Sequence, residues 1–109
     1  MSREAEAVSV FAALADPTRL RLLKRLSSEG SLSITRLSEG SGVTRQAITR
    51  HLYALGSAGL ARHQRQGREQ IWDLDRRRLE KARQYLDQVA AQWDAAAARL
   101  KAFVEGQDG

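Results

Sequence analysis

The chain has 109 residues, of which 42% are hydrophobic and 28% are charged, and its formal net charge is +5. This composition excludes a disordered chain of low hydrophobicity, and the length fits a single domain spanning residues 1–109. No stretch approaches the roughly 20 apolar residues of a membrane-spanning helix, so we expect a cytoplasmic protein without membrane contact. The chain contains no cysteine, which excludes disulfide bonds and thiolate metal sites.

The positive charge is concentrated in the middle of the chain. Residues 17–68 contain ten basic and two acidic residues, a net charge of +8. Residues 1–16 and 69–109 carry net charges of −2 and −1. A basic block between weakly acidic ends is typical of a protein whose central part binds a polyanion such as nucleic acid.

Two helices are predicted at the start of the chain. Residues 2–15 lack glycine and proline and carry apolar side chains at helical spacing. Asp16 and Pro17 end this helix and begin a second one, because aspartate is a good N-cap and proline a good first helical residue. The second helix is predicted to end at Ser27 or Ser28. Three of its leucines are expected to face the core: Leu20, Leu23 and Leu26.

Two further helices follow, separated by a glycine-containing turn. Ser33 is predicted to cap a short third helix, and Thr44 is predicted to cap a fourth helix that runs to about Ser57. The turn between them contains Gly40 and Gly42. Two helices joined by a short turn with glycine are the signature of a helix-turn-helix motif.

After the fourth helix the pattern changes from helical spacing to alternation. Segments 60–66 and 69–74 are separated by Gly67 and Arg68, which predicts a β-hairpin with a tight turn. From Arg76 onward, apolar residues recur at steps of three and four and predict one long helix. The predicted fold is therefore a winged helix-turn-helix, mainly α, with about five helices and a two-stranded wing.

The fourth helix has an outward face that suits base recognition. At about 100° per residue, its apolar residues share one side and its polar residues the other. Arginine matches O6 and N7 of guanine, glutamine matches N6 and N7 of adenine, and a recognition helix presents such residues near its N-terminus. Arginines at the hairpin tip would reach phosphates or the minor groove. The candidate DNA-binding residues are Thr44, Arg45, Gln46, Thr49, Arg50, Tyr53, Arg65 and Arg68. The alternative is that these are ordinary solvent-exposed side chains.

No catalytic or metal-binding pattern accompanies this motif. His51 is expected to be partly buried beside core leucines, His63 lies on a predicted strand, and no further ligand stands at a useful spacing. Asp73 and Asp75 are expected to cap the last helix rather than act as an acid–base pair. Because no nucleophile triad, dinucleotide motif or P-loop is present, we predict no enzyme activity, no cofactor and no metal.

The first and last helices carry apolar faces that a winged-helix core does not need. Residues 8–75 would contain the first helix and the DNA-binding core, and residues 76–105 a C-terminal dimerisation helix. A homodimer would bury these faces and match a two-fold symmetric site in double-stranded DNA. The alternative is that both helices pack on the core of their own chain. The candidate interface residues are Val8, Phe11, Leu86, Val89, Trp93 and Leu100.

Several motifs in the expected order resemble the ArsR-type (arsenical-resistance repressor) winged-helix regulators. Residues 12–23, AALADPTRLRLL, resemble the opening signature of that family. Residues 43–52, VTRQAITRHL, together with AGL at 58–60 and RQGR at 65–68, resemble its recognition helix and wing. The resemblance implies a homodimeric repressor of an imperfect inverted repeat, with the first and last helices as its dimer interface.

The differences from the family pattern concern metal sensing. Metal-sensing members carry Cys-x-Cys in the third helix, where this chain has Ser33, Ile34 and Thr35, and others place histidines on the last helix, which has none here. The resemblance therefore implies the metal-free branch. Two alternatives stay open: a winged-helix module that docks an acidic protein, and a repressor gated by a small apolar ligand between the first and last helices. Outward-facing Gln46 and Arg50 favour DNA binding over docking.

Overall fold

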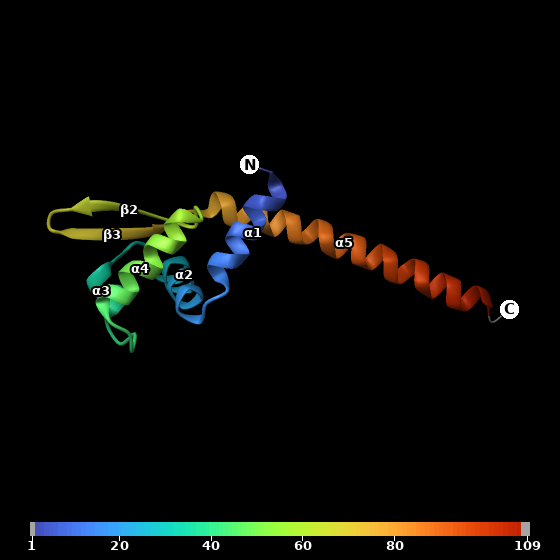
Figure 1. The fold of residues 1–109 in the computed structure, drawn as a ribbon, viewed down its shortest axis with the longest axis horizontal. Coiled ribbons are helices and arrows are strands. Elements are labelled where there is room, and N and C mark those ends of the chain that lie inside the picture. Colours follow the sequence, from blue (N-terminus) through green and yellow to red (C-terminus); the bar gives the residue numbers. More distant parts are fainter. Residues whose placement is uncertain (1, 108–109) are drawn as a thin grey trace.

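The computed structural model describes residues 2–107 and has the predicted winged helix-turn-helix architecture (Figure 1). Its elements are α1 (Arg3–Leu14), α2 (Pro17–Glu29), β1 (Leu32–Ser33), α3 (Ile34–Ser38), α4 (Arg45–Ser57), β2 (Ala61–Gln66), β3 (Glu69–Leu74) and α5 (Arg76–Gln107). One correction concerns the wing, which was predicted to have two strands. The short strand β1 also pairs with β3, so the sheet has three antiparallel strands in the order β1-β3-β2.

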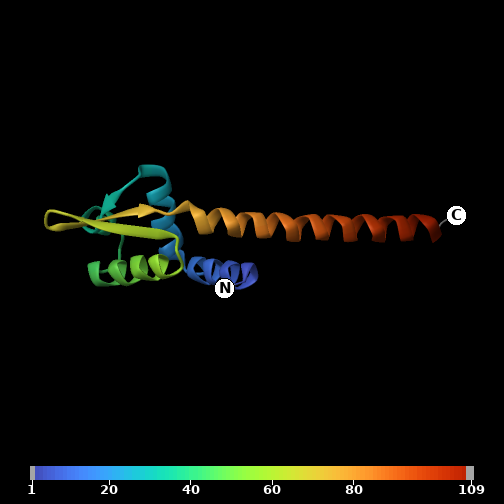
Figure 2. The ribbon, with the colours of Figure 1, turned by 90° about the horizontal axis from the view of Figure 1, so that it is seen from above.

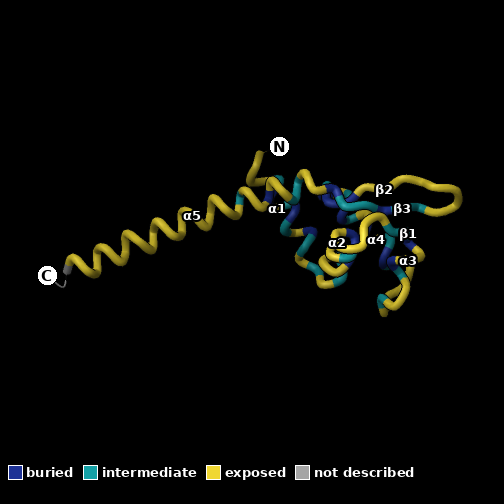
Figure 3. Tube along the Cα trace, turned by 180° about the vertical axis from the view of Figure 1, so that it is seen from behind, coloured by how far each residue is buried: buried dark blue, intermediate teal, exposed yellow. Residues whose placement is uncertain are grey.

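The molecule is elongated, 73 × 30 × 20 Å, because α5 projects from the body that the other elements form (Figures 1 and 2). The beginning of α5 packs against α1. From Leu86 to Gly106 every residue of α5 is exposed (Figure 3). Within residues 2–107, no helix combines the length and the apolar character needed to cross a membrane.

Side-chain caps determine where the central helices begin. The Asp16 carboxylate accepts a 3.0 Å hydrogen bond from the backbone N–H of Arg19, and Pro17 is the first residue of α2. The hydroxyl groups of Ser33 and Thr44 accept hydrogen bonds from backbone N–H groups three residues later, at 3.0 and 3.1 Å. The caps predicted for α2, α3 and α4 are thus confirmed, and each stabilises its helix by about 1 kcal/mol.

Trp72 of β3 is the largest completely buried side chain of the core. In the sheet it stands opposite Leu32 of β1 and opposite His63 of β2, so it lies where all three strands meet. Buried aliphatic side chains of α2, α3 and α4 belong to the same core: Leu22, Leu23, Leu26, Ile34, Leu37, Ile48, Leu52 and Leu55. The helix-turn-helix and the wing therefore share one hydrophobic core.

The inward faces of α1 and α2 differ in detail from the prediction. Leu20 is 43% exposed, and Leu22 takes the inward position beside Leu23. In α1, Val8 is 60% exposed. The residues of α1 that are buried are Ala7, Val10 and Ala13. Because α1 packs against both α4 and α5, small side chains on its inner face allow the close approach of these helices.

Asp75 marks the point where β3 ends and α5 begins. Its backbone N–H donates to the carbonyl oxygen of Leu60 at 2.9 Å. Its carboxylate accepts hydrogen bonds from the side chain of Arg77 at 2.8 Å and from the Arg77 backbone N–H at 3.1 Å, and these bonds lower the pKa of Asp75 from 3.8 to about 2. Asp75 thus caps α5 as predicted. Asp73, predicted to cap as well, instead pairs with Arg62 across the hairpin at 3.4 Å.

Gly59 allows α5 to approach the end of α4. Its φ of +77° is in the left-handed region, which residues with a side chain rarely adopt. A Cβ atom at this position would lie 2.5 Å from Cδ of Arg78, which belongs to the first turn of α5. The backbone conformation therefore requires glycine here, and the Arg78 side chain packs into the space that a Cβ atom would occupy.

We expect Asp75→Asn to destabilise the fold at neutral pH by about 1–2 kcal/mol, a range reduced for the solvent exposure of Arg77. Because the pKa of Asp75 is lowered in the folded state, its contribution is complete above about pH 4 and disappears as the pH falls toward 2. Urea unfolding followed by circular dichroism should therefore show a large difference between parent and variant at pH 7 and a smaller one at pH 3.

The matched control is Asp73→Asn, which removes a half-exposed carboxylate two residues earlier. Its ion pair with Arg62 is largely exposed, so this variant should lose less than about 1 kcal/mol at pH 7. An Asp75→Asn variant that unfolds at the same urea concentration as the parent at pH 7 would contradict the role given to this cap.

Candidate nucleic-acid interface

Arg25 of α2 ties the helix-turn-helix to the body of the molecule. Its guanidinium donates hydrogen bonds to the carbonyl oxygens of Arg36 and Leu37 at the end of α3, at 3.4 and 3.3 Å. The same group pairs with Glu29 at 2.8 Å, which raises the pKa of Arg25 and lowers the pKa of Glu29. Because α3 packs against α4, the bonds between Arg25 and α3 also help to position α4.

The helix α4 has one buried and one exposed face, as predicted. Its completely buried residues are Ile48, Leu52 and Leu55. The exposed polar residues near its N-terminus are Arg45, Gln46 and Arg50. This end of α4 lies on the side of the body remote from α5 (Figure 1). The side chains with base-recognition chemistry are therefore presented to solvent at the outer end of the helix.

The hydroxyl groups of the two threonines of the candidate site each form one hydrogen bond with the backbone of α4. The Thr44 oxygen accepts from the backbone N–H of Ala47 at 3.1 Å, so its hydrogen is left to donate, for example to a phosphate. The Thr49 hydroxyl donates to the carbonyl oxygen of Arg45 at 2.9 Å, so its oxygen is left to accept, for example from a base amino group. The two hydroxyls thus have opposite hydrogen-bonding capacity.

The tip of the wing carries the other two candidate arginines. Arg65 and Arg68 are exposed on either side of Gly67, whose φ is +61°. The Arg65 Nε donates to the carbonyl oxygen of Gly67 at 3.4 Å. The hairpin turn that carries both residues extends past α3 and α4, on the side of the N-terminal end of α4 (Figures 1 and 2).

The basic residues of the central block divide into paired and unpaired groups. Three arginines have carboxylate partners: Arg25 with Glu29, Arg36 with Glu39 and Arg62 with Asp73. The candidate arginines form no ion pair with a carboxylate of residues 2–107: Arg45, Arg50, Arg65 and Arg68. Arg19, Arg21 and Lys24 of α2 also form no ion pair within residues 2–107. The positive charge that is free to meet a polyanion is therefore on α4, the wing tip and α2.

Tyr53 lies on the outward face of α4 but contacts the wing. Its hydroxyl oxygen accepts a hydrogen bond of 3.1 Å from Gln70. Its ring packs edge-on against Trp72 and His63, with centroid distances of 5.3 and 5.5 Å. A DNA contact of Tyr53 stays a prediction. The sequence reasoning missed Gln70 and His63, because their proximity to α4 depends on how the hairpin folds back and not on local spacing.

His51 is partly buried, as expected, and its Nδ1 lies 3.8 Å from a carboxylate oxygen of Asp16. The pKa of Asp16 is lowered, first by the hydrogen bond from the Arg19 backbone N–H and less by His51. Across the part of the chain that the structure describes, no three His, Cys, Asp or Glu side chains gather as a set of metal ligands.

Comparisons with known proteins agree with this architecture. A helix-turn-helix domain family matches residues 14–64. An HTH-type transcriptional regulator of Methanocaldococcus jannaschii is 31% identical over 67 residues, which are 62% of this chain and 75% of that protein. The HTH-type transcriptional regulator NmtR of Mycobacterium tuberculosis is 36% identical over 70 residues, which are 64% of this chain and 58% of NmtR.

Two solved structures extend the likeness to the whole fold. An ArsR-like transcriptional regulator from Rhodococcus sp. RHA1 has a TM-score of 0.78 and 38% identity, covering 90% of this chain and 92% of its own. A homodimeric winged helix-turn-helix DNA-binding domain from Mycobacterium bovis has a TM-score of 0.63 and 28% identity, covering 81% and 80%.

The basic outward face of α4, the flanking wing and these relatives define the class of the protein: a DNA-binding helix-turn-helix transcription regulator, and not an enzyme. More closely, the chain belongs to the ArsR family of transcription regulators. The family resemblance of the sequence motifs is thereby confirmed.

The site makes different predictions for its helix and wing arginines. We expect Arg50→Ala to lower affinity by about 1–3 kcal/mol and to relax base preference at one position in each half-site, as for an arginine bidentate to guanine. Arg68→Ala should instead weaken all DNA sequences similarly, because phosphate contacts carry no sequence information. Fluorescence anisotropy with a set of singly substituted DNA duplexes measures both effects.

Arg83→Ala is the matched control, since it removes the same charge from α5, where Arg83 contacts Glu80. It should leave DNA affinity close to that of the parent. If Arg50→Ala discriminates among the duplexes as the parent does, the proposed recognition face is misplaced.

Proposed function

We propose that this regulator is a homodimeric repressor that binds an inverted-repeat operator and does not respond to metals. The observation that carries the proposal is the exposed apolar stripe of α5. Trp93 is 75% exposed, and the other large apolar residues of the stripe are exposed as well: Leu86, Val89, Leu100, Phe103 and Val104. Such a contiguous apolar surface on a small protein favours an interface with another protein.

A second copy of the chain is the partner that fits this stripe best. Between Leu86 and Gly106 no other element of the protomer covers α5, and helices in water gain most of their stability from tertiary packing. Val8 on α1 adds exposed apolar surface near the beginning of α5. The related domain from Mycobacterium bovis is homodimeric, which supports the same assembly here.

A two-fold dimer explains the expected operator. Two identical α4 helices related by a two-fold axis match two half-sites of an inverted repeat. The repressor role is what the resemblance of the sequence motifs to ArsR-type repressors implies. Docking of an acidic protein instead would not use the base-recognition chemistry of Gln46 and Arg50.

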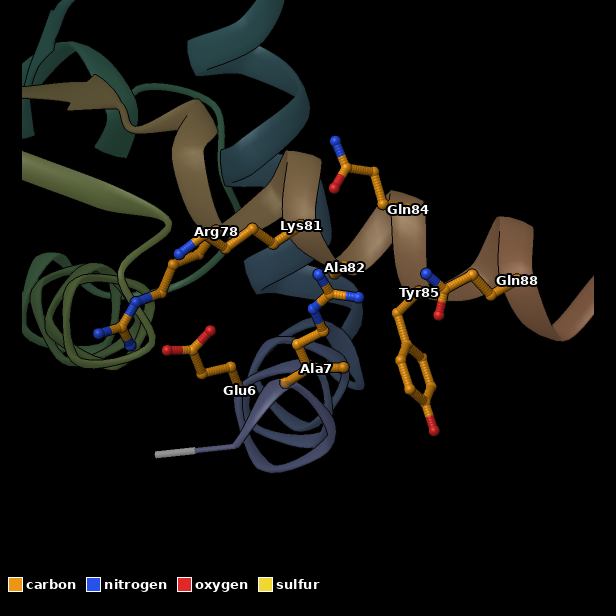
Figure 4. Close-up of a pocket in the computed structure, with 9 residues that line it drawn as sticks. Glu6, Ala7, Arg78, Lys81, Ala82, Gln84, Tyr85 and Gln88 are labelled. Carbon is orange, nitrogen blue, oxygen red and sulfur yellow. The ribbon is translucent and has the colours of Figure 1, made fainter.

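The alternative of a small apolar effector finds little support between α1 and α5. A hollow of about 250 Å³ lies there (Figure 4), lined in part by Arg3, Glu6, Arg78 and Lys81. An apolar ligand in it would remove these charges from water without pairing them, which is unfavourable. We therefore propose a repressor whose control does not depend on an apolar ligand at this place.

Selection of genomic fragments with the purified protein, followed by sequencing, should enrich fragments that contain an imperfect inverted repeat. A reporter driven by the enriched promoter should be repressed by the protein, and zinc, cadmium or arsenite should not relieve this repression, because Ser33 and Thr35 replace thiolates. Failure to enrich any sequence would favour the protein-docking module. Release of the DNA by a stoichiometric metal would contradict the metal-free proposal.

Trp93→Ala tests the dimer interface. If Trp93 is buried between two copies, its truncation should cost about 3–5 kcal/mol, shared between folding and association. Sedimentation equilibrium of the parent should show a dimer at micromolar concentration, and the variant should dissociate. Circular dichroism then verifies that the dissociated variant is still helical.

Asp87→Ala is the control, because at about 100° per residue the exposed Asp87 lies on the side of α5 away from the stripe. It should leave the dimer intact. A parent that stays monomeric, or a folded Trp93→Ala variant that remains fully dimeric, would show that the stripe does not form the interface.

A further inference from the structure

We propose that Gln70 of β3 is a positioning residue, which holds the wing against the outward face of α4 and so fixes the wing arginines relative to Arg50. The inference rests on the proposed DNA contacts of Arg50, Arg65 and Arg68, and it adds a residue that does not itself touch DNA. It also gives Tyr53 a role as the point on α4 to which the wing is attached.

The geometry around the Gln70 amide supports this role. Its Nε2 lies 3.1 Å from the Tyr53 hydroxyl oxygen and 3.0 Å from Nδ1 of His63. A primary amide nitrogen carries two hydrogens, so it donates to both acceptors at once. In the bond to His63, Nδ1 is the acceptor, because the amide nitrogen can only donate. A glutamate at position 70 has no N–H and cannot make the same pair of bonds.

The position of Gln70 along the hairpin determines which part of the wing these bonds hold in place. Gln70 stands opposite Arg65 in the ladder, so the two side chains leave the same face of the sheet. Only the pair Gln66 and Glu69 lies between it and the turn. The base of the wing is anchored by Trp72, which is completely buried, whereas β2 is exposed from Arg62 to Gln66. Gln70 therefore ties the outer half of the wing to α4.

On the helix side, Tyr53 follows Arg50 by three residues and so lies on the same face of α4. The Tyr53–Gln70 bond thus joins the two parts of the proposed DNA-binding surface: Tyr53 lies one turn after Arg50, and Gln70 stands opposite Arg65 in the ladder. A two-stranded ribbon is only marginally ordered by itself, so the loss of this tie leaves the wing tip free to move. The arginines at the tip then have to be ordered again when DNA binds, which weakens binding.

The experiment uses the whole 109-residue chain and a duplex from the genomic selection. DNA affinity is measured by fluorescence anisotropy over a range of salt concentrations for the parent, Gln70→Ala, Arg68→Ala and the double variant. Gln64→Ala is the matched control: it removes the same amide from the same hairpin, but Gln64 stands opposite Ile71, on the face of the sheet that points away from Tyr53. Tyr53→Phe removes the hydroxyl acceptor and keeps the ring.

Gln70→Ala is expected to weaken binding about fivefold, which corresponds to a loss of about 1 kcal/mol of binding free energy. It should also reduce the dependence of affinity on salt, because fewer phosphates are contacted. Arg68→Ala should cost less in the Gln70→Ala background than in the parent, and Tyr53→Phe should produce a part of the same effect. Gln64→Ala should bind as the parent does.

Simple additivity of Gln70→Ala and Arg68→Ala would overturn the proposal, as would an equal loss from Gln64→Ala. Amide hydrogen exchange without DNA gives an independent readout: Gln70→Ala should speed exchange in residues 64–70 and leave α2 unchanged, and unchanged wing protection would also overturn the proposal. If Arg68→Ala alone leaves affinity unaltered, the assumed wing contact fails, and hydrogen exchange still decides whether Gln70 orders the wing.

Discussion

The burial of Trp72 is the interaction on which the arrangement of α4 and the wing, and so of the proposed DNA-binding surface, depends. It belongs to β3, stands opposite residues of β1 and β2, and contacts Tyr53 of α4 through its ring. A side chain of this size gains several kcal/mol from leaving water, which far exceeds what the exposed hydrogen bonds of the wing contribute. The burial of Trp72 therefore fixes the base of the wing against α4. Polar contacts such as those of Gln70 refine the position of its outer half.

The basic residues serve two separate purposes that net charge alone does not distinguish. Arg25, Arg62 and Arg77 bond to carboxylates or carbonyl oxygens, and they join α2 to α3, β2 to β3, and Asp75 to the start of α5. These pairs neutralise charge within the fold. The arginines of the outward face of α4 and of the wing tip are without a carboxylate partner in residues 2–107, as are Arg19, Arg21 and Lys24 of α2, so these residues supply the attraction for a polyanion.

Much of the fold follows from local patterns in the sequence, and the departures have physical reasons. Caps such as Thr44 and turn residues such as Gly67 act over three or four positions, so they predict helix and hairpin boundaries well. Leu20 was placed inward because Leu20, Leu23 and Leu26 share a helical face, but Leu22 lies close to the same face and packing selected it instead. The strand β1 is two residues long, too short for any alternation to be visible.

The candidate site also has a part that local sequence patterns predict and a part that they do not. The exposure of Arg45, Gln46 and Arg50 was predictable, because the opposite face of α4 is apolar at regular spacing. The contact between Tyr53 and Gln70 was not, because it joins residues 17 positions apart through the fold of the hairpin. Helical periodicity identifies an outward face, but it does not tell whether that face meets solvent, DNA or another part of the chain.

The direct connection of the wing to α5 has a consequence for the proposed dimer. No linker separates β3 from α5, and the junction is held by the bonds of Asp75 to Leu60 and Arg77 and by the packing of Arg78 on Gly59. The direction in which α5 leaves the body is therefore tied to the end of α4. In a two-fold dimer formed through α5, this junction determines the separation of the two α4 helices, which has to match half-sites about one helical turn of DNA apart. A shift of α5 relative to α1 would change that separation, so in such a dimer the proposed interface and the proposed DNA-binding surface would be mechanically coupled although they lie at opposite ends of the protomer.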